Sequence, residues 1–450
     1  MSTLSPRADA VPARALPLLY FAVGYVALPL AFAVVAVAPR SVAGFFYHPR
    51  LIGIVHLVTL GWITAAILGA LFIVLPVALK TPFPARRSDY WAFASFAIGV
   101  IGMVAHFWLE ESGGMAWSGL MAAAAILHVG WRVVPRVLRA PIQGGVKLHV
   151  TLAFVNIALA AAAGVTIGFD KVYHFLPGYI IANVLAHTHL AALGWASMMA
   201  LGVGYRLLPM VFGTSMPKGP TLYVSAILLE AGALGLFGAL MLRSRWSVVF
   251  AACTVAAFGW FAVHLRGMRR HAPAAGLPRP DVGTWHALQA FAYLGVAAIV
   301  GLTLTVIEPS ERSLRFALVY GVCGLLGFLA QLVMGMEMRL VPMAAWYWTF
   351  VRTGDVPLFS AHALGSRRWA VLSFALWTAA LPLVIAGFAL DRAGVLQTGA
   401  AIGCAATLIT GSQGLLVVRH AFAAPRWLSW TRAGARRRHS HQLAVPQGHS

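Results

Sequence analysis

Long apolar runs separated by short polar segments recur along almost the whole chain. A membrane-spanning helix needs about 20 consecutive apolar residues. Twelve runs reach this length, at approximately 16–38, 52–79, 90–109, 114–135, 147–168, 178–208, 221–242, 246–266, 284–307, 313–343, 369–390 and 395–418. The first of them lacks the short core and the cleavage site of a signal peptide. The pattern predicts an all-α membrane protein with twelve transmembrane helices in one domain, residues 1–425.

A motif of small residues and proline occurs three times within these runs. Each copy has Leu-Gly followed by an aromatic residue, a second glycine eight residues after the first, and a proline seven residues later. The copies begin at Leu60, Leu193 and Leu326, so the spacing is identical between successive copies, and we call it the repeat period. Close helix packing explains small residues in general, but a gapless fixed period indicates a repeated structural unit. We therefore expect three pseudo-symmetric four-helix repeats, at approximately 15–139, 140–270 and 280–420.

Charged residues are few and unevenly placed. Only 10% of the residues are charged and 60% are hydrophobic, yet the formal net charge is +21. With the N-terminus inside, 25 of the 33 Lys and Arg residues fall on the inner side, which follows the positive-inside rule. We therefore expect both termini in the cytoplasm, contact with the lipid bilayer and no nucleic-acid partner. Residues 426–450 are expected to form a basic, disordered cytoplasmic tail.

Three histidines are predicted to lie within transmembrane helices, one or two turns from the outer end. His56 and His189 are one repeat period apart and so occupy the same place in the repeat, where the third copy has Val322. An imidazole at this depth is costly unless it is paired or ligated, and histidine is a common ligand of haem and copper. The alternative to ligation is that these histidines form hydrogen bonds with carbonyl or hydroxyl groups between the helices. His187 and His189 are separated by about 200° around a helix. This suits ligands of two different metal centres, or one metal ligand and one hydrogen-bonded neighbour.

Further polar residues are predicted within the membrane. His106, near the outer end of the third helix, is an additional candidate ligand. The intramembrane charges are Glu230, Glu337, Arg206 and Arg339. Such charges mark functional sites by default. An ion pair between Glu337 and Arg206 and a proton route from the cytoplasm are the two interpretations of this set.

Two segments resemble the catalytic subunit of the haem–copper oxidases: His56-Leu57-Val58-Thr59-Leu60-Gly61-Trp62, and His187-Thr188-His189 followed by Leu193-Gly194-Trp195. The likeness is closest to the cbb3-type oxidases, the nitric oxide reductases and their stand-alone relatives. It implies twelve helices with pseudo-threefold symmetry in a bacterial cytoplasmic membrane, and one or two haem b groups. By this resemblance His56 is an axial ligand of a low-spin haem, and His187 or His189 reaches a haem.

The sequence departs from that family at the copper site. The family carries its His-x-His pair on the tenth helix and an adjacent His pair near the seventh, and this chain has neither. We therefore expect a divergent, stand-alone haem protein of redox, respiratory or nitric oxide chemistry, without stoichiometric copper and with a redox partner subunit or cytochrome. An active oxygen or nitric oxide reductase is one alternative. A transporter or metal carrier that uses the histidines and Glu230 without haem is the other.

Overall fold

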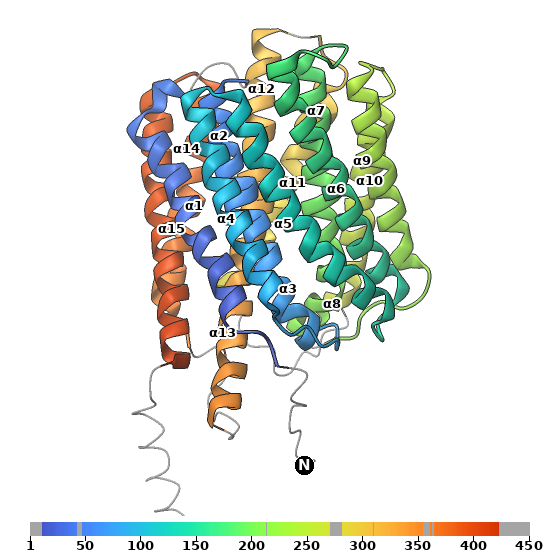
Figure 1. Ribbon diagram of the computed structural model, residues 1–450, viewed down its shortest axis with the longest axis vertical. Helices are drawn as coiled ribbons and strands as arrows, with labels where there is room; N and C mark the ends of the chain where they lie inside the picture. Colours follow the sequence, from blue (N-terminus) through green and yellow to red (C-terminus); the bar gives the residue numbers. More distant parts are fainter. Residues whose placement is uncertain are drawn as a thin grey trace, which may run out of the picture.

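The computed structural model describes residues 11–42, 47–212, 214–270, 281–308, 310–353, 361 and 364–422, and these ranges contain helices and connecting turns but no strand. Twelve of the helices are long and apolar enough to cross a membrane. The prediction of twelve helices with the length and hydropathy of membrane spans is therefore confirmed. The helices stand side by side as one bundle (Figure 1).

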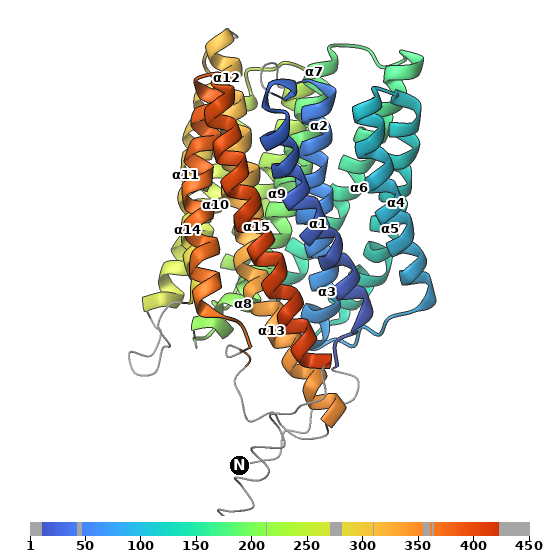
Figure 2. The same cartoon turned by 90° about the vertical axis from the view of Figure 1, so that its left-hand side faces the viewer.

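Nine of the spans are single α-helices: α1 (Ala15–Val37), α4 (Arg87–Leu109), α5 (Ser112–Arg139), α6 (Gly144–Tyr173), α9 (Thr221–Met241), α10 (Ser247–Arg270), α11 (Val282–Leu304), α14 (Arg367–Ala389) and α15 (Ala393–Phe422). A short 3₁₀ turn, η2 (Pro39–Ser41), follows α1. The start of α1 and the end of α15 lie at the same end of the bundle (Figure 2). The connection after α3, which contains Lys80 and Arg86, and the last turn of α5, which contains Arg136 and Arg139, also lie there, and we call it the basic end.

The other three spans are composite. Each consists of an α-helix, a π-helical segment and a second α-helix: α2 (Pro49–His56), η3 (Leu57–Thr64) and α3 (Ala65–Val77); α7 (Ile180–His189), η4 (Leu190–Ser197) and α8 (Met198–Phe212); and α12 (Glu311–Gly321), η5 (Val322–Ala330) and α13 (Gln331–Thr353). The starts of η3 and η4 are one repeat period apart, and η5 begins one position ahead of that spacing. Such π-helical turns are rare and are frequent at functional sites.

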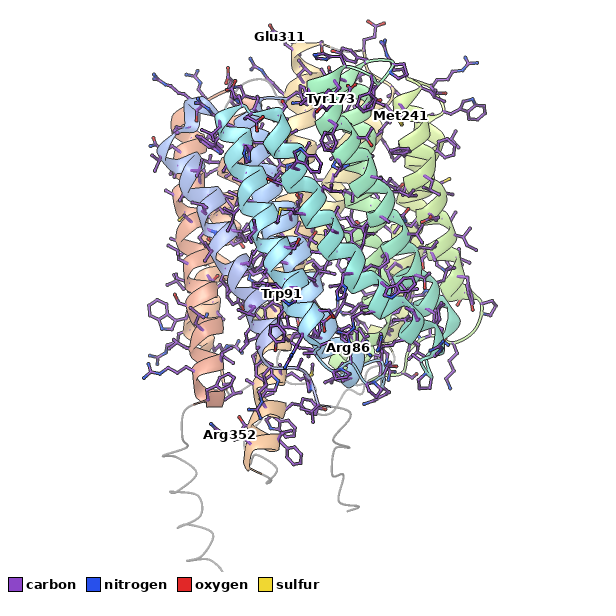
Figure 3. All side chains as sticks on the ribbon, in the orientation of Figure 1. Arg86, Trp91, Tyr173, Met241, Glu311 and Arg352 are labelled. Carbon is purple, nitrogen blue, oxygen red and sulfur yellow. The ribbon has the colours of Figure 1, made fainter. Side chains whose placement is uncertain are left out.

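Large apolar side chains cover the outside of the bundle. The exposed fraction is 65% for Val26, 69% for Ile101, 63% for Val263 and 69% for Ile299. Side chains project from every helix that faces the viewer in Figure 3. Soluble monomers rarely expose contiguous apolar surface of this extent. A lipid bilayer would cover this surface.

Two tryptophans join the π-helical segments near the centre of the bundle. Trp62 of η3 donates its Nε1 hydrogen to the carbonyl oxygen of Ala330 in η5, at 3.1 Å. Trp195 of η4 donates to the hydroxyl oxygen of Thr64 in η3, also at 3.1 Å. Trp62 and Trp195 are one repeat period apart, and Thr64 and Ala330 are two such periods apart. Phe328 occupies the equivalent position in the third copy of the motif, and its side chain has no N–H to donate.

The first glycine of each motif allows a neighbouring helix to approach closely. A Cβ atom built on Gly61 would lie 2.5 Å from the Cβ atom of Ala27 in α1. A Cβ atom on Gly194 would lie 2.7 Å from the Cβ atom of Asn156 in α6. Because both distances are shorter than any ordinary contact between carbon atoms, a larger residue would push the helices apart. These contacts place the composite spans against α1 and α6.

Candidate functional site

His56 is held in a defined orientation at the junction of α2 and η3. Its Nδ1 atom lies 2.8 Å from the carbonyl oxygen of Ile52, one turn earlier. Because a carbonyl only accepts, Nδ1 carries the hydrogen and Nε2 keeps its lone pair. The ring stacks on Phe107 of α4, with centroids 5.1 Å apart and planes 27° apart. The side chain is partly buried, and its Nε2 atom has no hydrogen-bond partner among the described residues.

His189 stands at the equivalent junction of α7 and η4, and its environment differs. Its Nδ1 atom donates to the carbonyl oxygen of Leu185 at 2.8 Å, as His56 does to Ile52. Its Nε2 atom accepts from the Tyr320 hydroxyl of α12 at 3.2 Å. The two rings stack with centroids 5.8 Å apart and planes 18° apart. The lone pair of His189 is therefore already engaged.

His187 points to the other side of the same helix. Its Nδ1 atom donates to the carbonyl oxygen of Ala160 in α6, at 2.9 Å. A Cβ atom built on Gly164, also in α6, would lie 2.8 Å from the imidazole, so the glycine leaves room for the ring. His187 also lies within electrostatic range of His56. The contacts with α6 for His187 and with α12 for His189 confirm that the two rings face different sides.

His106 takes no part in this group. Its Nδ1 atom donates to the carbonyl oxygen of Gly102 at 2.6 Å, and its Nε2 atom lies 3.7 Å from a carboxylate oxygen of Glu111. It precedes Phe107, the residue on which His56 stacks. In the part of the chain that the structure describes, no three His, Cys, Asp or Glu side chains are grouped so that they could hold a metal ion.

Tyr320 is a site residue that the sequence reasoning missed. It lies one repeat period after His187 and so occupies the place of that histidine in the third copy of the motif. A tyrosine at a histidine position carries no signal by residue type. Applying the repeat period to every candidate would have found it.

The four intramembrane charges lie in separate surroundings. Glu230 accepts a hydrogen bond from the Asn156 amide at 2.6 Å. Arg206 donates to the carbonyl oxygen of Ala78 at 2.7 Å. Glu337 is only 3% exposed, and neither carboxyl oxygen has a hydrogen bond of normal geometry in the described residues, although the Tyr25 hydroxyl is near. The structure therefore does not join Glu337 to Arg206.

Arg339 forms an ion pair outside the group of histidines. Its guanidinium donates to both carboxyl oxygens of Asp281, at 2.7 and 2.9 Å. Burial alone would raise the pKa of Asp281, but the hydrogen bonds and charge of Arg339, together with hydrogen bonds from Thr284, lower it overall. The pair fixes the start of α11 to α13. It lies at the basic end, away from the histidines.

No protein-family profile and no curated protein matches this chain. The fold defines its class as a polytopic helical protein whose twelve long apolar helices suit a lipid bilayer. What it does must be inferred from the side chains themselves.

Proposed function

We propose that the chain is a haem-binding integral membrane protein, related to the catalytic subunits of haem–copper oxidases and acting in redox, respiratory or nitric oxide chemistry. The observation that carries this proposal is the hydrogen bonding of two imidazoles from neighbouring composite spans. His56 and His187 each donate Nδ1–H to a backbone carbonyl, and each leaves Nε2 without a partner among the described residues. Histidines that bind metals characteristically donate their other ring nitrogen in this way.

The number of available donors favours a haem over a bare metal ion. A structural or catalytic zinc or copper site takes three or four protein ligands, and the described residues offer no such group. Haem iron receives four nitrogen ligands from its own macrocycle and needs only one or two side chains. A bound haem would supply electron transfer or the binding of a diatomic gas.

Within this proposal the histidines have different roles. His56 and His187 would hold the haem iron, because neither Nε2 atom has a hydrogen-bond partner among the described residues. His189 would either stay bonded to Tyr320 beside the haem, or give up that hydrogen bond to bind a second haem. Electrons would come from a redox partner subunit or a cytochrome. Copper is not expected, since few histidines remain to bind it.

We also propose the threefold repeat as the architecture of the bundle. Three observations support it: the matched π-helical segments, the hydrogen bonds from two tryptophans at equivalent positions, and the close approaches at Gly61 and Gly194. The basic end would face the cytoplasm, with both termini on that side of a bacterial cytoplasmic membrane.

The test is the optical spectrum of protein purified from cells with ample haem. Wild type should show the sharp reduced band of a low-spin b-type haem, and His56→Ala and His187→Ala should abolish it. His106→Ala is the matched control, because that ring also donates Nδ1–H to its own helix but lies outside the group. A colourless wild-type preparation would refute the haem proposal and favour a transporter.

A further inference from the structure

A small pocket opens at the basic end, between the loop that follows α3 and the end of α5. It has a volume of about 320 Å³. Residues 80–82, just after α3, form one wall, and Arg136, Arg139 and Ala140 at the end of α5 form the other. Three cationic side chains, Lys80, Arg136 and Arg139, therefore converge from two separate elements.

Positive charge accumulates around this pocket with little compensation. Arg136 lies within electrostatic range of three further guanidinium groups, those of Arg86, Arg132 and Arg139, and of one carboxylate, that of Asp89. That carboxylate is already bound by Arg132. The excess of like charge is unfavourable unless an anion is present.

The packing of Arg136 holds it in this position. It donates to the carbonyl oxygen of Arg132 at 2.6 Å, and its guanidinium lies 5.5 Å from the centre of the Phe83 ring. One cation of the pocket is thus fixed before any ligand arrives. Lys80 and Arg139 are exposed and can close on a ligand from either side.

Exposed apolar side chains also lie toward this end of the bundle, on other faces of the same helices. Trp131 and Leu138 of α5 are 79% and 53% exposed, and Trp91 of α4 is 77% exposed. Trp91 lies on the outer surface of the bundle, with Arg86 nearer the basic end (Figure 3). Tryptophan is enriched where a bilayer meets water. The pocket therefore lies close to the level at which lipid headgroups would meet the acyl region of a bilayer.

We infer that this pocket binds the phosphate group of an anionic phospholipid, such as phosphatidylglycerol. Arginine and lysine would bind the phosphate oxygens through charge-assisted hydrogen bonds. The acyl chains would extend from the basic end along the apolar outside of the bundle. This lipid site is independent of the proposed haem.

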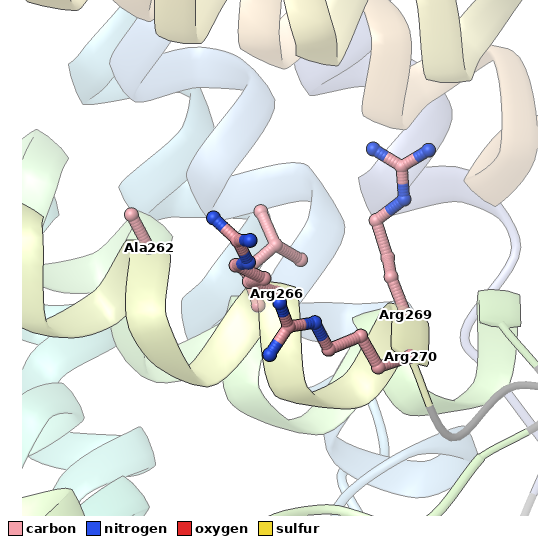
Figure 4. Close-up of a pocket in the computed structure, with 5 residues that line it drawn as sticks. Ala262, Arg266, Arg269 and Arg270 are labelled. Atoms are coloured by element: carbon pink, nitrogen blue, oxygen red, sulfur yellow. The ribbon is translucent and has the colours of Figure 1, made fainter.

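A second basic pocket at the same end provides the contrast. It is lined by Arg266, Arg269 and Arg270 together with Ala262 and Leu265, all from α10 (Figure 4). The Arg270 side chain extends back along the helix toward Arg266 (Figure 4). No residue of another described element lines it. We expect it to attract anions without selecting among them.

The experiment compares lipid binding to the detergent-purified full chain by native mass spectrometry. Wild type should bind phosphatidylglycerol at least about tenfold more tightly than phosphatidylcholine. Lys80→Gln/Arg139→Gln should lower the phosphatidylglycerol affinity about tenfold, as expected for the loss of one or two charge-assisted contacts. The control Arg266→Gln/Arg270→Gln removes the same charge and should change it less than about twofold. Both pairs are exposed, so the variants should fold.

Three results would overturn the inference. Equal losses in the two double variants would mean that only diffuse attraction acts. Equal affinity of wild type for phosphatidylglycerol and phosphatidylcholine would remove the role of the headgroup charge. If inorganic phosphate at the same concentration displaced the lipid, the ligand would be a free phosphate and not a lipid.

Discussion

The tryptophan hydrogen bond between η4 and η3 can be tested by a double-mutant cycle. Trp195 is 2% exposed and Thr64 is also 2% exposed, so water cannot replace their 3.1 Å hydrogen bond. Trp195→Phe removes the donor, and the chain itself carries phenylalanine at the equivalent position, Phe328. Thr64→Val removes the acceptor with little change of shape.

The coupling free energy between Trp195 and Thr64 should be modest, because polar side chains also find hydrogen-bond partners in the unfolded state of a membrane protein. Polar pairs between membrane helices contribute about 0.6 kcal/mol on average and about 1.7 kcal/mol at most. The double variant should therefore be more stable than the sum of the single effects by that amount. This corresponds to about threefold to eighteenfold in the unfolding equilibrium constant.

The assay is reversible unfolding in bicelles, measured by steric trapping at two fixed sites. Trp348→Phe is the control donor, since Trp348 is equally buried and donates to Pro12 at the basic end. It should show no coupling to Thr64→Val. If the effects of Trp195→Phe and Thr64→Val simply add, the hydrogen bond does not hold the π-helical segments together, and that support for the threefold repeat is lost.

Three further predictions concern topology, metal content and pH. Reporter fusions after α15 should be active only in the cytoplasm; activity on the outside would contradict the proposed orientation. Metal analysis of the pure protein should find iron but no stoichiometric copper, and one copper per chain that is lost in His187→Ala would reveal a binuclear centre. The lowered pKa of Asp281 means that its pair with Arg339 stabilises the fold above the unfolded pKa of about 4 and is lost as pH falls through the folded value. The unfolding temperature should therefore fall less between about pH 6 and about pH 3 in Asp281→Asn than in wild type. Identical pH dependence of the two proteins would refute this.

The spans were predictable because they depend on length and hydropathy alone. The run at 221–242 has the length and hydropathy of a membrane helix, and the structure places α9 at Thr221–Met241. The repeat period also identified His56 and His189 as equivalent positions. It did not predict the π-helical segments, since hydropathy changes little when each turn gains one residue.

The partners of the polar residues were less accessible to sequence reasoning. Glu337 and Arg206 have opposite charges on neighbouring repeats, yet Arg206 bonds to the Ala78 carbonyl and Glu337 remains buried without a normal hydrogen bond among the described residues. Glu230 meets Asn156, and His189 meets Tyr320. Each of these partners depends on which face a neighbouring helix presents, and that is decided by packing across the bundle.

The π-helical segments set the rotation of one half of each composite span relative to the other half. One additional residue rotates everything beyond it by about 100° around the helix axis. Deleting one residue within Leu57–Thr64 would restore an ordinary helix but turn His56 away from Phe107 while α3 kept its place. The direction in which each imidazole points is thus set by the number of residues in the following turn as much as by the imidazole's own contacts.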